Sequence, residues 1–108
     1  MATGKQYIDY LSEQLKPLEE IVFRPMMGEY LLYYKGRLAG GVYDERLLIK
    51  PVPSAREYMP DAEEAIPYDG AKPMLLVDNT DDSEFLCGLF NAIFNDLPEP
   101  KTKKKNNG

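Results

Sequence analysis

The sequence predicts a single α+β domain in which helices cover one face of an antiparallel sheet of about five strands. Short β-branched or aromatic runs are separated by connections of only three to five residues, and an amphipathic segment stands near each end. Such short connections can join only antiparallel neighbours, so the central runs should form a meander. The 108 residues, 44% of them hydrophobic, suffice for one core and leave little room for a second domain.

The first helix is expected over residues 4–16. Its apolar stripe consists of Ile8, Leu11, Leu15 and Leu18. These positions recur at intervals of three and four, the spacing of one helical face. Thr3 is the expected N-cap, because its hydroxyl can accept from a free N–H of the first turn. Pro17 disfavours helical geometry at the residue before it and closes the segment.

The strands of the meander are expected at residues 20–24, 30–34, 38–43 and 47–50. A glycine-containing loop, Lys35-Gly36-Arg37, connects the second run to the third. Gly40 and Gly41 lie inside the third run. Glycine weakens a strand, so the pair predicts a bulge or a close approach by a helix or another backbone.

The second half is expected to contain a short helix at residues 53–59, a loop at 61–73, a strand at 74–77 and a final helix. The final helix has a capping-box pattern, with Asp81 as N-cap and Glu84 three residues later. Its broad apolar face runs from Phe85 to Leu97, and Pro98 ends it. The expected order is therefore α-β-β-β-β-α-β-α.

The charge distribution separates a body from a tail. Four of the 13 basic residues are Lys101, Lys103, Lys104 and Lys105, whereas all 18 acidic residues precede them, so residues 1–100 carry a net charge of −9. We expect residues 1–100 to form the domain and residues 101–108 to be a disordered Lys-rich tail. An acidic body repels phosphate backbones, so nucleic-acid binding is expected only through the tail.

The single cysteine, Cys87, excludes an intrachain disulfide, which small secreted domains usually need. The first residues contain no apolar core of a signal peptide, and no apolar run approaches the roughly 20 residues that cross a bilayer. We therefore expect a cytoplasmic protein with no membrane association.

Catalytic groups are scarce. The chain has no histidine, which removes the commonest general base and the usual transition-metal ligand. Cys87 follows Glu84 on the same helix, and that carboxylate would oppose thiolate formation. We expect no enzymatic activity, no catalytic residues, no cofactor and no metal. A small enzyme acting through carboxylates such as Glu29, Asp44 or Asp78 remains the alternative.

Tyrosines are concentrated on the predicted meander. By strand alternation Tyr30 and Tyr34 share one face, whereas Leu31 and Tyr33 share the other. If helices cover only one face, some of these side chains are exposed, where tyrosine suits protein recognition. Ordinary cross-strand packing is the equally weighted alternative.

Five segments resemble the TfoX N-terminal domain family, which is associated with regulators of DNA-uptake competence. They read FRPMMGEY at 23–30, YKGRLAGG at 34–41, RLLIK at 46–50, MPDA at 59–62 and PYDGAKPM at 67–74. The resemblance extends from the first helix to Pro100. It implies a two-layer fold similar to that of secretion chaperones, and a non-enzymatic role based on interactions.

Full-length competence regulators of this family have a C-terminal helical domain, whereas this chain ends at Gly108. We therefore expect a stand-alone module for protein interaction or regulation, linked to DNA-uptake competence, with a protein partner or a second copy of itself. The alternative is a nucleic-acid-associated accessory protein that uses the basic tail. The expected interaction residues are the exposed motif positions Arg24, Met27, Tyr30 and Lys50.

Overall fold

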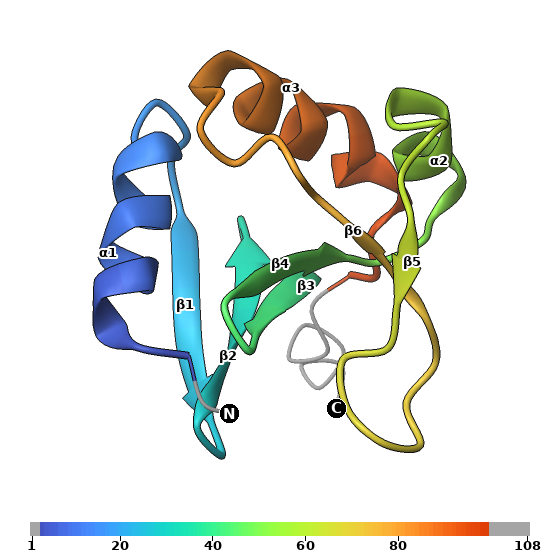
Figure 1. Cartoon of the computed structure of the whole chain (residues 1–108). Helices are drawn as coiled ribbons and strands as arrows, with labels where there is room; N and C mark the ends of the chain where they lie inside the picture. Colours follow the sequence, from blue (N-terminus) through green and yellow to red (C-terminus); the bar gives the residue numbers. More distant parts are fainter. Residues whose placement is uncertain (1–2, 100–108) are drawn as a thin grey trace, which may run out of the picture.

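The computed structural model describes residues 3–99 as three α-helices and a six-stranded antiparallel sheet of order β1-β2-β3-β4-β6-β5 (Figure 1). The elements are α1 (Lys5–Gln14), β1 (Ile21–Met26), β2 (Glu29–Tyr34), β3 (Arg37–Tyr43), β4 (Arg46–Ile49), α2 (Pro53–Tyr58), β5 (Glu64–Ala65), β6 (Met74–Leu76), α3 (Ser83–Ile93) and the 3-10 helix η1 (Phe94–Asp96). The predicted α+β class is confirmed. The predicted Lys-rich tail at residues 101–108 lies outside the described residues.

Two-residue turns join the first four strands. Met27-Gly28, Lys35-Gly36 and Asp44-Glu45 have positive φ at both positions, with values from 50° to 87°. This is the backbone of turns whose twist matches that of the flanking strands. The strands on either side pair directly, which confirms the predicted meander.

All three helices pack on one face of the sheet. The strands, with the residue that follows β6, contribute Leu32, Tyr34, Ala39, Val42, Leu47, Ile49, Leu75 and Val77 to the core. The helices and the segments that follow them contribute Ile8, Leu11, Leu15, Ala55, Met59, Leu86, Leu89, Phe90, Ile93 and Leu97. The opposite face of the sheet contributes no residue to this core, as the prediction required.

The glycine pair in β3 marks both features predicted from the sequence, a β-bulge and a close approach by another backbone. Leu32 pairs with Gly40 and Tyr33 pairs with Leu38, which leaves Ala39 as the extra residue of a β-bulge. A Cβ on Gly40 would overlap the backbone oxygen of Leu48 and lie 2.9 Å from Cα of Ile49. Strand β4 therefore approaches β3 more closely than any other residue type would allow.

Both predicted helix caps were wrong by one residue. Gly4 is the N-cap of α1, because Thr3 turns its hydroxyl away from the helix and donates to Glu29. Asp82, not Asp81, caps α3 and accepts from the amide of Phe85 at 3.1 Å. Adjacent Asp residues are equally good caps, so the sequence could not distinguish them.

The predicted loop at residues 61–73 contains an additional strand, which the expected order lacked. β5 has only two residues, Glu64 and Ala65, and is held by pairing with Leu75 and Met74 of β6. Such a short strand has no periodicity of its own.

The last α-helix ends at Ile93 and is followed by the 3-10 helix η1 instead of continuing to Leu97.

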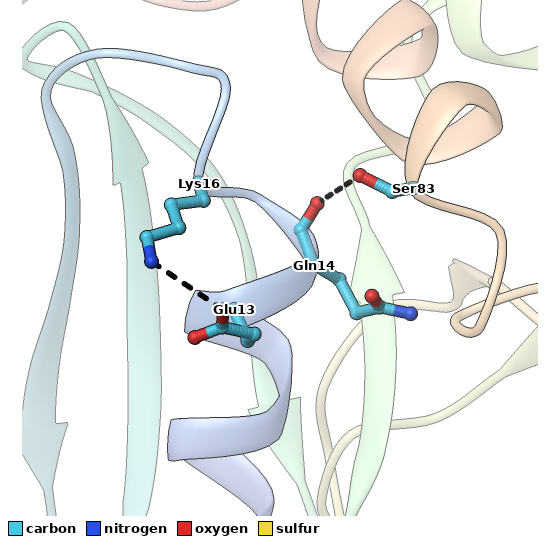
Figure 2. Close-up of polar contacts among 4 residues, drawn as sticks. All are labelled: Glu13, Gln14, Lys16 and Ser83. Atoms are coloured by element: carbon cyan, nitrogen blue, oxygen red, sulfur yellow. Dashed lines mark hydrogen bonds and ion pairs between the residues drawn. The ribbon is translucent and has the colours of Figure 1, made fainter.

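The C-terminal end of α1 is attached to the start of α3. The Ser83 hydroxyl donates to the main-chain carbonyl of Gln14 at 2.6 Å, and the side-chain amide of Gln14 donates to the Thr80 carbonyl at 3.0 Å. Figure 2 shows the Ser83 hydroxyl directed at that carbonyl, with the Lys16–Glu13 ion pair on the other side of the helix end. These bonds satisfy a helix end that would otherwise depend on water.

Gly88 lets α2 and α3 approach each other. A Cβ on Gly88 would overlap the Tyr58 hydroxyl, which donates to the Phe85 carbonyl at 3.0 Å. We expect Gly88→Ala to destabilise the protein by about 1–2 kcal/mol, because the lost bond and the clash outweigh alanine's better helix propensity. In a Tyr58→Phe background the clashing oxygen is gone, so the same substitution should cost about 1 kcal/mol less. Urea unfolding of the four proteins measures this coupling, and an equal cost in both backgrounds would refute it.

Candidate interaction surface

One part of the sheet is covered by no helix and consists of apolar side chains around a single arginine. We call it the open-face patch, and its members are Val22, Arg24, Leu31, Tyr33 and Leu38. Cross-strand register places Val22 opposite Tyr33 and Tyr33 opposite Leu38, with Arg24 opposite Leu31. Residues directly opposite each other share a face, and none of the five belongs to the core or packs against it.

The patch is accessible to solvent. Val22 is 52% exposed, Arg24 is exposed, and the other three side chains are half-buried. The guanidinium carbon of Arg24 lies 5.6 Å from the centre of the Tyr33 ring, within cation–π range. An aromatic ring, aliphatic neighbours and an arginine are the side chains enriched at protein interfaces.

The patch ends where the Tyr43 ring covers Gly41. A Cβ on Gly41 would lie 2.6 Å from that ring, and the Tyr68 ring is 6.0 Å from it, centre to centre. Tyr43 is only 5% exposed, and Arg46 donates to the Ile66 carbonyl at 3.4 Å. The segment between β5 and β6 thus closes this part of the open face.

Burial raises the pKa of Tyr43 above its usual 10.0, and the neighbouring Tyr68 and Glu29 raise it further. The folded state therefore retains this proton above about pH 10, where the unfolded chain releases it. Stability is unaffected by this group below that pH and falls as the pH rises above it. We expect Tyr43→Phe to flatten the decline in unfolding free energy between pH 9 and 11. Urea titrations at several pH values measure the slope, and an unchanged slope would contradict this assignment.

The four predicted interaction residues do not form one surface. Arg24 belongs to the open-face patch, and Met27, 95% exposed, occupies the tip of the β1–β2 turn. Tyr30 lies on the helix-covered face, half-buried against the core. Lys50 follows β4, where its amide donates to the Ala39 carbonyl. Of the four, only Arg24 therefore lies in the open-face patch.

Of the carboxylates considered for catalysis, Glu29 and Asp44 are neighbours on adjoining turns, whereas Asp78 lies apart from them. Glu29 accepts from the Thr3 hydroxyl at 2.6 Å and from the Asp44 amide at 3.0 Å, while the Thr3 oxygen accepts from the Glu45 amide at 3.0 Å. These bonds tie the chain start to the β1–β2 and β3–β4 turns. Asp78 lies elsewhere, beside an open hollow.

That hollow has a volume of about 240 Å³. Its lining residues are Met59, Pro60, Asp61, Ala62, Leu76, Asp78, Asn79 and Phe85. Within the described residues, no group of three or more His, Cys, Asp or Glu side chains is placed to hold a metal ion. The Cys87 sulfur lies 3.9 Å from the Gln14 carbonyl, half-buried between α1 and α3, away from the hollow's lining.

Together, the antiparallel sheet, the one-sided helix layer and the open-face patch define an α+β domain with an accessible sheet surface. Residues 13–81 match the family model of the TfoX N-terminal domain. The chain belongs to this family, as its sequence motifs predicted.

A relative from Spirochaeta aurantia, described as an "Uncharacterized 12.7 kDa protein in trpE 5'region", is 31% identical over 105 residues. The alignment covers 96% of this chain and 91% of the relative. No solved structure matches the chain. No helix in residues 3–99 is long and apolar enough to cross a membrane.

Proposed function

We propose that the chain is a non-catalytic module that binds another protein through the open-face patch and thereby regulates it. The observation that carries this proposal is the accessible apolar surface of β1–β3, which no helix covers. Partly exposed apolar side chains that lie together on a small domain are typical of an interaction site. Membership of a family associated with regulators of DNA-uptake competence supports a regulatory role in that process.

The chemistry of the patch specifies the partner's complementary surface. Leu31, Tyr33 and Leu38 offer apolar contact area, and Arg24 offers one cation held beside the Tyr33 ring. A matching partner presents apolar side chains and a carboxylate that reaches Arg24. An arginine paired in this way adds specificity to the apolar contact.

Leu38→Asp tests this proposal, because it places a charge in the patch without touching the core. Partners captured from cells of the source organism by the unaltered chain are purified, and their affinity for both proteins is measured. We expect the variant to bind about tenfold or more weakly, since losing a central interface contact costs about 1–2 kcal/mol.

Ile66→Asp is the matched control, because Ile66 is an exposed apolar residue, 50% accessible, outside the patch. It should bind like the unaltered chain, and thermal unfolding should show both variants folded. Equal affinity of all three proteins would refute binding through the patch. Turnover of a defined substrate, abolished by changing one acidic side chain, would refute the non-catalytic role.

A further inference from the structure

Strand β1 forms a free edge of the sheet, since it pairs with β2 alone at the end of the strand order. The Lys35 amide donates to the Glu20 carbonyl at 2.9 Å, so even-numbered residues of this segment direct their backbone groups toward β2. Ile21 and Phe23 consequently direct their main-chain N–H and C=O groups away from β2, where no described group bonds to them. In Figure 2, α1 stands in front of the sheet and β1 is outermost.

Pro25 limits how another strand can pair with this edge. It is also an outward-facing position, but proline has no N–H to donate. If a second copy pairs antiparallel with Val22 opposite Val22, Ile21 of each copy lies opposite Phe23 of the other. These two residue pairs form four main-chain hydrogen bonds, and none of them needs an N–H from Pro25. A register centred on Phe23 would place Ile21 opposite Pro25 and lose one donor on each side. The backbone therefore favours the register centred on Val22.

The same register pairs opposite charges. Residues whose numbers add up to 44 lie opposite each other. Arg24 of each copy therefore comes level with Glu20 of the other, which directly precedes β1 and has a φ of 60°. Arg24 and Glu20 are both exposed, and Val22, 52% exposed, meets its own counterpart at the centre. Opposite charges across antiparallel strands stabilise the pairing, whereas like charges oppose it. A charge pattern that complements itself identifies a second copy of this chain as the occupant.

We propose that two copies of the chain associate through antiparallel β1 strands, joining their sheets into one continuous sheet. Ile21 and Phe23 are half-buried at the end of the core, and the association would shield both side chains further. This self-association goes beyond the proposed function. It uses Val22 and Arg24 of the patch, whereas Leu31, Tyr33 and Leu38 lie on β2 and β3, outside the contact.

Sedimentation over a range of concentrations tests the proposal with the whole chain. The unaltered protein should shift from monomer to dimer as its concentration rises. Arg24→Glu should weaken the dimer about tenfold or more, because each attractive pair becomes repulsive. Combining it with Glu20→Arg restores opposite charges and should recover most of the affinity. Lys72→Glu, an equal charge change on an exposed loop residue, should leave the dimer intact.

Hydrogen exchange gives a second, independent measurement on the unaltered chain. The amides of Ile21 and Phe23 should exchange more slowly at high concentration, because they donate only in the dimer. A monomer at every concentration would overturn the proposal. So would a dimer that Arg24→Glu leaves intact, or one that Lys72→Glu weakens equally. None of these results would bear on partner binding measured with Leu38→Asp.

Discussion

Replacing Gly40 by alanine should destabilise the protein by about 3 kcal/mol or more, at the upper end of single-residue effects. The added methyl group would overlap the Leu48 carbonyl oxygen and press on Cα of Ile49, both backbone atoms of the neighbouring strand. A backbone cannot rotate away as a side chain can, so β3 and β4 must separate at the bulge. Urea unfolding measures the loss.

Gly70→Ala is the control for this substitution. Gly70 has φ of 87° and open space around it, so alanine there incurs only the cost of left-handed backbone, about 1 kcal/mol. The difference between the two variants isolates the strand contact. Equal losses would mean that β4 does not approach Gly40 as closely as the structure shows.

Phe90→Ala should destabilise the protein by about 3–5 kcal/mol, enough to unfold a domain of ordinary stability. Phe90 is fully buried, and its ring meets the Tyr34 ring edge-to-face at 6.0 Å. The substitution leaves a cavity between α3 and the sheet and removes this aromatic contact. Thermal and urea unfolding report the loss.

The loss of stability in Phe90→Ala can be compared with the losses in two further variants. Phe90→Leu keeps most of the apolar volume and should cost about 1–2 kcal/mol. Val22→Ala, on the helix-free face, should change stability by less than about 0.5 kcal/mol. A loss at Val22 as large as that at Phe90 would mean that the open face is covered.

Local patterns were sufficient to predict the long elements. The stripe of Leu11 and its neighbours predicted α1, and the short connections between strands predicted the meander, because helix periodicity and loop length are local properties. The two residues of β5 could not be found in this way, since only their pairing with β6 makes them a strand. The exact cap of α1 also depended on a tertiary contact, the bond from Thr3 to Glu29.

The candidate site was only partly predictable. Alternation correctly placed Tyr33 and Tyr30 on opposite faces of the sheet, because side chains along a strand alternate with a period of two. The same counting from Val42 would place Leu38 on the core face, but the bulge at Ala39 reverses the alternation and moves Leu38 to the open face. The sequence suggested a bulge near Gly40 without showing which residue it displaces. Met27 was expected only as an exposed motif position, and its place in a turn was not predicted.

Site-specific photocrosslinking in living cells tests the central claim most directly. A photoreactive side chain is placed at Tyr33 or Leu38 within the patch, and at Ile66 outside it. We predict that the two patch positions cross-link to the same protein, distinguishable by mass from a second copy of this chain, and that position 66 does not. A cross-link that forms equally well at position 66, or none at either patch position, would contradict the open-face patch as a binding surface.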